Sequence, residues 1–267
     1  MAPTDPAIAA RIRREPPRFR QARVAAVEPR SPWMMQVTIE GPALEGLAVD
    51  EPAASVRLLL PSPGTDDLVV PEWNGNEFLL PDGSRPVIRT LTPSRTRAGS
   101  RELVVSIVLH DGGVASAWAA AVPPGAEVAV SGPGRGYTVD PDASDLLVAG
   151  DESAIPAIEQ LLEVLPAAAA AQVHIEVTHP DARLPLDGRS GVRITWHDLP
   201  AGGEPGETLV HAVRDARIDP ATRVWAAGEA AAMQRIRKHL FDACGLPRPQ
   251  AVVRGYWKRG RGGDADG

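Results

Sequence analysis

The 267-residue chain has very little cysteine and no long apolar run. Its one cysteine, Cys244, cannot form an internal disulfide, hold an iron–sulfur cluster or build a cysteine zinc site, so any resident redox cofactor should be organic. No apolar stretch reaches the roughly 18 residues of a membrane-spanning helix. Residues 1–20 also lack the apolar core of a signal peptide. We therefore expect a cytoplasmic protein that does not contact a membrane.

The chain also lacks an excess of positive charge. Its formal net charge of −6 argues against non-specific binding to nucleic acid or to a membrane, although a local basic pocket remains compatible with it. We find no His/Asp/Glu cluster with metal-ligand spacing and predict no metal site. With 43% hydrophobic and 23% charged residues, the composition is typical of a globular protein. The length suits one large domain or two of about 100–150 residues each.

The first half of the chain reads as β-structure. Short runs rich in β-formers alternate apolar and polar residues, and Pro and Gly punctuate the gaps between them. This pattern predicts an antiparallel barrel or sandwich. The expected strands include Gln36–Glu40, Ser55–Leu60, Glu102–His110 and Glu127–Ser131.

The second half alternates strands with helices, which predicts a parallel sheet with ligands at the carboxyl ends of its strands. Helical spacing appears over Ala154–Leu165 and Glu229–Cys244. The alanine run Ala167–Ala171 follows a proline and reads as a loop edge. We place the domain boundary near Gly136–Ala143. The expected strands are Asp145–Ala149, Val173–Thr178, Val192–Trp196 and Arg223–Ala227.

The segment Arg89–Arg95 places an arginine near a strand end and a hydroxyl soon after it. It resembles the flavin signature Arg-x-Tyr-Thr-x-Arg of the ferredoxin–NADP reductase superfamily, with Leu91 at the tyrosine and Ser94 at the second arginine. A guanidinium can pair with the FAD pyrophosphate in a bidentate way, and a hydroxyl on the same strand face can reach the flavin edge. The alternative is a surface turn with unrelated arginines. The candidate FAD contacts are Arg89, Thr90, Leu91 and Thr92.

The segment His110–Trp118 leaves a strand, passes two glycines and opens a helix expected at Ala115–Ala121. It resembles the motif His-Gly-x-Gly-Pro-Ala-Ser-x-Trp-Ala. Glycines let the backbone approach a phosphate, and first-turn amides bind anions. Alternatively, Ser116 only caps the helix and His110 is a packed or hydrogen-bonded histidine. The candidate pyrophosphate contacts are Gly113, Ala115 and Ser116, and His110 is a further candidate cofactor contact.

The segment Leu147–Ile158 is a strand, a turn and a helix start. It resembles the motif Leu-Leu-x-Gly-Asp-Glu-Thr-Ala-Leu-Pro-Ala-Ile at the first βα turn of a nicotinamide-binding domain. Its two carboxylates either contact a ribose or cap the helix, and capping is at least as good an interpretation. The candidate cofactor contacts are Gly150, Asp151, Glu152 and Ser153.

Two further segments, Val224–Ala230 and Gly255–Gly260, resemble the motifs Trp-x-Ala-Gly-Glu and Gly-Tyr-Trp-Arg-x-Gly. A glycine that ends a strand and opens a helix offers a second nicotinamide contact. A C-terminal aromatic ring either covers the flavin face, where nicotinamide displaces it, or packs between the domains. The candidate cofactor contacts are Gly228, Glu229, Tyr256 and Trp257.

Taken together and in this order, the motifs resemble the siderophore-interacting protein family of NAD(P)H-dependent ferric-siderophore reductases. The resemblance implies a two-domain β + α/β fold. Residues 15–138 would form an antiparallel FAD-binding β-barrel, and residues 143–260 a Rossmann-like parallel α/β domain that binds NADPH or NADH. Residues 261–267 would be a disordered tail. Electrons would pass from the nicotinamide through FAD to Fe(III) and release Fe(II), so no side chain is assigned a catalytic role.

An anionic ferric siderophore needs a basic site despite the acidic total charge. The positions that match the basic cluster of the family are Arg57, Arg135, Lys258 and Arg259. Each of them is alternatively a solvated surface charge. Other interpretations stay open: a flavin reductase that feeds a protein acceptor, or a siderophore-binding protein without enzyme activity. A ferredoxin is an alternative electron donor, and the sequence does not distinguish NADH from NADPH.

Overall fold

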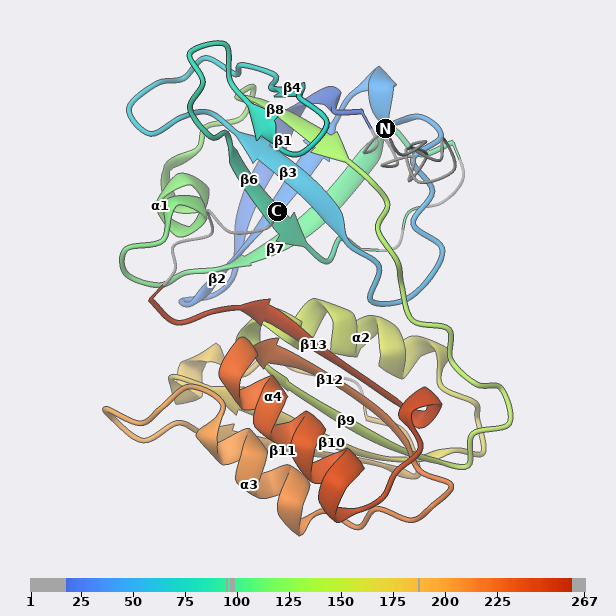
Figure 1. Cartoon of the computed structure of the whole chain (residues 1–267). Coiled ribbons are helices and arrows are strands. Elements are labelled where there is room, and N and C mark those ends of the chain that lie inside the picture. The colour runs from blue at the N-terminus through green and yellow to red at the C-terminus, as the bar shows by residue number, and fades with distance from the viewer. Residues whose placement is uncertain (1–17, 95, 97–98, 187, 261–267) are drawn as a thin grey trace, which may run out of the picture.

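The computed structural model describes residues 18–94, 96, 99–186 and 188–260. The expected tail at 261–267, the first residues of the expected barrel at 15–17 and Arg95 lie outside this part. Two bodies follow each other along the chain, a barrel and an α/β sheet (Figure 1). Within the described part, none of the helices combines the length and the apolar character needed to cross a bilayer.

The first body is a six-stranded antiparallel sheet with the order β6-β3-β8-β1-β2-β7. An isolated bridge between Pro93 and Val105 joins its two edges, which closes the sheet into a barrel. Alternate residues of the strands fill the interior, as in β7, where Leu103, Val105 and Ile107 are buried. Its strands are β1 (Arg20–Ser31), β2 (Met34–Glu40), β3 (Val56–Leu60), β6 (Val87–Leu91), β7 (Glu102–Val108) and β8 (Glu127–Ser131).

Short elements decorate the barrel. A 3₁₀ turn, η1 (Pro42–Leu44), follows β2, and a small hairpin pairs β4 (Glu72–Trp73) with β5 (Phe78–Leu79). The helix α1 (Val114–Ala121) follows β7 and lies at the side of the barrel (Figure 1). The predicted barrel is confirmed, including the helix that follows the second motif.

The second body is a five-stranded parallel sheet with the order β11-β10-β9-β12-β13. The chain begins in the central strand β9 and then fills the two sides in turn, so a topological switch point lies between β9 and β12. Ligands of open α/β sheets bind outside the carboxyl ends of the strands at such a point. The strands are β9 (Asp145–Asp151), β10 (Ala170–Val177), β11 (Val192–Asp198), β12 (Arg223–Glu229) and β13 (Ala251–Trp257).

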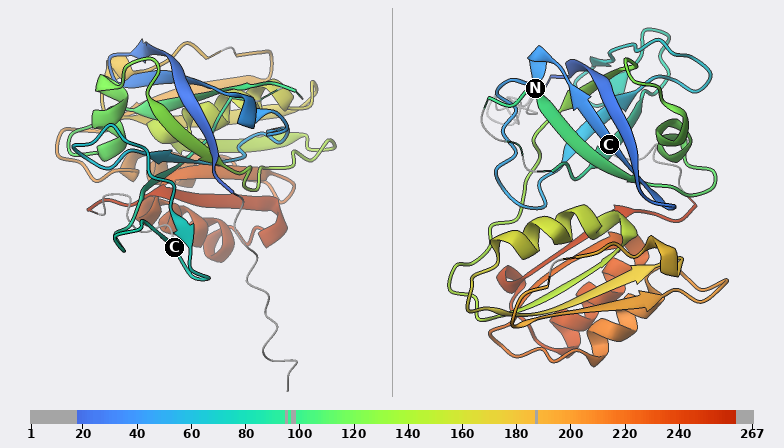
Figure 2. Two further views of the ribbon diagram at one scale, coloured as in Figure 1. Left: turned by 90° about the horizontal axis from the view of Figure 1, so that it is seen from above. Right: turned by 180° about the vertical axis from the view of Figure 1, so that it is seen from behind.

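Helices cover both faces of this sheet, as Figure 2 shows from two further directions. Successive residues of β9 alternate between the faces: Val148 packs with α2 (Ile155–Val164), while Leu147 packs with α3 (Glu207–Asp215) and α4 (Ala230–Lys238). The remaining turns are η2 (Glu152–Ala154), η3 (Pro180–Ala182), the π-helical η4 (His239–Ala243) and η5 (Arg248–Gln250). The predicted parallel α/β domain is confirmed.

Two local expectations were wrong, and a predicted helix was confirmed with a π-helical end. The alanine run is not a loop throughout, because β10 begins at Ala170 and Ala171 is buried in the sheet. Ser116 is not the N-cap of α1; that position belongs to Gly113. The long helix expected over Glu229–Cys244 is α4 followed by the π-helical turn η4, with Glu229 as its N-cap.

Candidate functional site

Polar side chains tie the two bodies together along a seam between the barrel, α2 and β13 (Figure 1). Arg30 of β1 forms an ion pair with Glu159 of α2 at 2.5 Å, and both side chains are about three-quarters buried. Gln160 of α2 is buried and bonds to two barrel loops. Where the chain passes from barrel to sheet, Arg223 pairs with Asp140 at 2.8 Å. The seam is therefore a fixed polar interface.

The first and last motifs meet at this seam. Buried Thr92 lies beside the phenol of Tyr256 at the end of β13. Burial raises the pKa of the Tyr256 phenol, and the neighbouring Thr92 hydroxyl opposes that rise. The Tyr256 ring also packs edge-on against Trp225, with 6.3 Å between centroids. A residue of the predicted flavin signature thus touches the predicted C-terminal aromatic.

The carboxylate of Asp151 is the centre of the switch point between β9 and β12. One of its oxygens accepts from the backbone N–H and the hydroxyl of Ser153 at 3.0 and 2.5 Å. The other accepts from the backbone N–H of Glu229 at 2.9 Å and from the indole Nε1 of Trp257 at 2.7 Å. Burial raises the pKa of Asp151 to about 6, while the bonds from Ser153 and Trp257 oppose that rise. Asp151 joins the third motif to both parts of the fourth.

The other carboxylates of these motifs also have partners within the chain. Glu152 accepts from the backbone N–H and the hydroxyl of Thr178. Glu229 caps α4 by accepting from the first-turn amides of Ala231 and Ala232. For Asp151 and Glu152 the structure gives a capping or bridging role of the kind that the sequence analysis left open, and it gives Glu229 a capping role that was not expected. Their contact with a cofactor stays a prediction.

Close packing accounts for two of the predicted glycines. A Cβ atom at Gly228 would lie 2.6 Å from the Asp151 carboxylate, and one at Gly150 would lie 2.5 Å from the Cβ atom of Ala154. Real Cβ atoms do not approach other atoms this closely, so any larger residue must displace its neighbours. Both glycines are thus required by the turn itself, in addition to any cofactor contact.

The second motif forms a compact turn between β7 and α1. The buried Ser116 hydroxyl accepts from the backbone N–H of His110 and donates to its carbonyl, both at 2.8 Å. Gly113 lies under the His110 ring, where a Cβ atom would come within 2.4 Å of the ring carbon Cε1. The exposed His110 ring contacts the carbonyl of Asp111 at 3.1 Å. Ala115 lies in the first turn of the helix.

This turn is compatible with an anionic group such as the FAD pyrophosphate. Among the residues that the structure describes, no side chain caps α1, and its first turn has no acidic residue. The first-turn amides of a helix that lacks such a cap favour an anion. In the α/β body, by contrast, carboxylates cap η2, α3 and α4. The residues of the second motif therefore fit FAD.

The strand β6 carries the rest of the flavin signature. Arg89 is half-buried and its guanidinium donates to the carbonyl of Ile88 at 2.8 Å. Thr90 is exposed and pairs with Arg57 of β3 across the sheet. Leu91 packs against the barrel core. The exposed Ser94 follows, bonded through its N–H to the carbonyl of Val104 at 2.7 Å.

The predicted substrate cations differ in their ion pairing. Arg259 pairs with Glu204 on the surface, so its charge is partly neutralised. Across the described residues, Arg57, Arg135 and Lys258 make no ion pair. Arg135 and Lys258 are exposed and Arg57 is half-buried. Arg57 lies beside Ser131 of β8, and Arg135 follows that strand by four residues.

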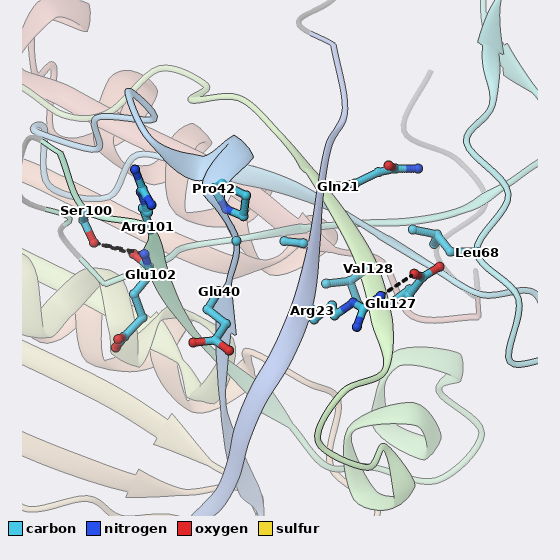
Figure 3. Close-up of a pocket in the computed structure, with 12 residues that line it drawn as sticks. Gln21, Arg23, Glu40, Pro42, Leu68, Ser100, Arg101, Glu102, Glu127 and Val128 are labelled. Atoms are coloured by element: carbon cyan, nitrogen blue, oxygen red, sulfur yellow. Dashed lines mark hydrogen bonds and ion pairs between the residues drawn. The ribbon is translucent and has the colours of Figure 1, made fainter.

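Two hollows differ in their relation to the motifs. A cleft of about 200 Å³ lies at the seam, and its lining includes Thr92, Ser94, Arg30 and Gln160. A larger hollow of about 650 Å³ lies on the barrel surface between the ends of β1, β2, β7 and β8. Figure 3 shows it with the paired Arg23 and Glu127 and no residue of the four motifs. The smaller cleft is therefore the one that adjoins the candidate site.

The sequence analysis missed two residues that organise the seam. Gln160 lies on the polar side of a correctly predicted helix, and the barrel covers that side. Arg254 directly precedes the C-terminal motif and donates to three barrel carbonyls. In the sequence, only its position next to the C-terminal motif pointed to Arg254. No local pattern pointed to Gln160.

Comparison with known proteins follows the same division of the chain. A family model described as a siderophore-interacting FAD-binding domain matches residues 23–137. A second, described as siderophore-interacting protein, matches residues 143–260.

Individual relatives extend over most of the chain. The Mycobacterium tuberculosis protein Rv2895c is 39% identical over 194 residues, 68% of this chain and 69% of the relative. The ferric vibriobactin reductase ViuB of Vibrio cholerae is 27% identical, over 87% of this chain and 86% of that protein. The crystal structure of a siderophore utilization protein from T. fusca is 33% identical, with a TM-score of 0.81 over 92% of this chain and 95% of that one. The chain therefore belongs to the siderophore-interacting protein family, and its N-terminal half is that family's FAD-binding domain, which confirms the predicted FAD cofactor.

Proposed function

We propose that the chain is a flavin-dependent reductase of ferric siderophores that takes electrons from NADH or NADPH. The observation that carries the proposal is the meeting of the first, third and fourth motifs at one seam, where Thr92 lies beside Tyr256 and Asp151 bonds to Trp257. Residues 15–138 would hold FAD and residues 143–260 the nicotinamide. The reaction would take place in the cytoplasm, which suits a chain with one cysteine.

Each motif has a part in this proposal. Arg89 and the first turn of α1 would hold the FAD pyrophosphate, with Thr90, Leu91, Thr92 and His110 beside the rest of the flavin. Gly150 and Ser153 at the switch point would contact the nicotinamide donor. Tyr256 or Trp257 would cover the flavin face. Bound FAD would supply the exchange between a two-electron donor and one-electron acceptors, so that one NAD(P)H reduces two ferric ions.

The cations at the seam support a negatively charged iron complex as substrate. Arg57, Arg135 and Lys258 are the unpaired candidates described above, and a ferric tris-catecholate carries three negative charges. Positive side chains without a carboxylate partner raise the local potential for such an anion. Arg259, which is paired with Glu204, would contribute less. The relationship to ViuB, named a ferric vibriobactin reductase, points to the same class of substrate.

An anaerobic assay tests the proposal. The protein with FAD receives NADH or NADPH, several ferric siderophores and a ferrous trap, and a reduced ferredoxin replaces the nicotinamide in a parallel arm. We expect trapped Fe(II) to form with at least one siderophore. Neutralising Arg57, Arg135 and Lys258 together should raise the apparent KM for anionic complexes.

Two results would favour the alternatives. Rapid reduction of a protein acceptor with no reduction of any siderophore would indicate a reductase of protein acceptors. A folded protein that takes up no FAD at saturating concentration, yet binds the ferric complex, would indicate a siderophore-binding protein without redox activity.

A further inference from the structure

Two segments of the barrel body, residues 51–57 and 131–137, run side by side at the seam, and we call them the basic ledge. The backbone N–H of Gly134 donates to the carbonyl of Ser55 at 2.7 Å. The two segments also pair within the sheet, where Arg57 of β3 lies opposite Ser131, the last residue of β8. The ledge carries two of the substrate cations predicted from the sequence, Arg57 and Arg135.

The guanidinium of Arg254 reaches from β13 of the other body onto this ledge. One of its nitrogens donates to the carbonyls of Ala53 and Arg135 at 3.2 and 3.1 Å, and the other donates to the carbonyl of Gly136 at 2.7 Å. The planar fork of an arginine holds such acceptors in fixed directions, which the single ammonium of a lysine does not. Arg254 thus joins both segments of the ledge at once.

The ledge is also held in an uncommon backbone conformation. Ala53 has a φ of 54°, in the left-handed region that residues with a Cβ atom seldom adopt. Its N–H is bonded to the side chain of Gln160 at 3.0 Å, and its carbonyl is bonded to Arg254. Such conformations persist where their surroundings enforce them, and they concentrate at functional sites. Two residues of the α/β body enforce this one.

The ledge carries one carboxylate near Arg254, that of Glu51, which accepts from the backbone N–H of Gly136 at 3.1 Å. No ion pair involves Arg254 in the part of the chain that the structure describes. Its carbonyl partners are neutral, so the charge of Arg254 adds to those of Arg57 and Arg135 against the single negative charge of Glu51.

We propose that Arg254 is a positioning residue for the anionic ferric complex: by bonding to the carbonyls of Ala53, Arg135 and Gly136, it fixes Arg135 relative to Arg57. The inference rests on the proposed function, because it assigns the ledge to the same substrate. Arg254 acts through the ledge, and Arg135 makes the contact.

Two variants of Arg254 separate the effect of its bonding geometry from that of its charge. Arg254→Gln removes the charge and the planar guanidinium, whereas Arg254→Lys keeps the charge and loses the guanidinium. We expect both to raise the KM for a ferric tris-catecholate, and its Kd from quenching of tryptophan fluorescence, by roughly tenfold, equal to about 1.4 kcal/mol. The kcat for that complex and the KM for a neutral quinone acceptor should stay within about twofold, a change worth less than about 0.5 kcal/mol.

Arg237→Gln is the matched control. Arg237 also donates to a backbone carbonyl of β13, that of Val253, but the bond lies within the α/β body. We expect it to leave the KM for the tris-catecholate unchanged. A double-mutant cycle with Arg135→Gln then tests the route of action, because residues that act through one another are not additive. Arg254→Lys should add little to the effect of Arg135→Gln.

The outcomes are distinct. If the unmodified protein reduces the tris-catecholate but Arg254→Lys binds it normally, charge rather than positioning matters and the inference is wrong, while the proposed function stands. Additive effects in the cycle would likewise overturn it. If the unmodified protein reduces quinone but neither binds nor reduces any ferric siderophore, the proposed function fails and the inference fails with it.

Discussion

Replacing Gln160 by methionine would remove the polar link between α2 and two loops of the barrel. Gln160 is 5% exposed. Its carbonyl oxygen accepts from the backbone N–H of Ala53 at 3.0 Å, and its amide nitrogen donates to the carbonyl of Pro93 at 2.5 Å. Methionine has a similar length and volume but cannot make either bond. The substitution therefore leaves two backbone groups without their partner at little steric cost.

The magnitude follows from these two groups. A buried donor or acceptor that loses its partner costs about 1–3 kcal/mol, so two of them cost roughly 2–6 kcal/mol. Burying the thioether of Met in place of an amide recovers part of this, about 1 kcal/mol or more. We expect the free energy of unfolding to fall by roughly 2–4 kcal/mol. The FAD affinity should also fall, because Pro93 directly follows Thr92 of the flavin signature.

Urea denaturation followed by circular dichroism measures the first effect, and titration of FAD absorbance measures the second. Gln172→Met is the control, since the half-buried Gln172 makes one comparable bond at the surface, to the carbonyl of Arg217 at 3.0 Å. A surface change of this kind should stay within about 0.5 kcal/mol. If both variants unfold at the same urea concentration, the seam does not depend on Gln160 and the reasoning fails.

Three further predictions concern the motifs. Gly228→Ala should lower the free energy of unfolding by about 1–3 kcal/mol, because its Cβ atom would press on the Asp151 carboxylate; Gly188→Ala, where an added Cβ atom meets nothing within 4 Å, is its control. Burial raises the pKa of Asp151 to about 6 from 3.8, so its contribution to stability is complete below pH 3.8 and is lost as the pH rises through 6. Asp151→Asn should abolish that slope between the two pH values in a series of urea titrations. Ser116→Ala should cost about 1 kcal/mol of stability by opening the turn before α1, and flavin titration should show weaker FAD binding; unchanged affinity would separate this turn from the cofactor.

Much of the fold was predictable because its signals are local. Alternation identified β2 and β8, a run of β-forming residues identified β7, and apolar spacing identified α2. The first strand was missed because two bulges in its pairing with β2 break the alternation of its side chains. The helix α3 was missed because its cap is not local: Glu176 of β10 bonds to the amides of Gly206 and Thr208 from 30 residues earlier in the chain.

The sequence indicated where the candidate site lies better than it indicated what each residue of the site does. Three of the four motifs meet at the seam, where Thr92 lies beside Tyr256 and Asp151 bonds to Trp257, while their cofactor contacts stay predictions. The sequence could not show that the Asp151 carboxylate bonds to Trp257, because the partners are 106 residues apart. Gln160 escaped notice for a related reason. It lies on the polar side of an amphipathic helix, which usually faces water, but here the barrel covers it.

The helix N-termini of the two bodies differ in whether a carboxylate caps them, and this difference constrains where an anion binds. At the switch point of the sheet, Asp151 and Glu229 already occupy the first-turn amides of η2 and α4. A phosphate there would compete with these buried carboxylates and would be repelled by them when they are charged. The start of α1 has neither a capping side chain nor an acid, and Gly113 stands there with no Cβ atom. The pyrophosphate of FAD is therefore expected on the barrel, and a nicotinamide donor at the switch point must be held mainly by its uncharged groups.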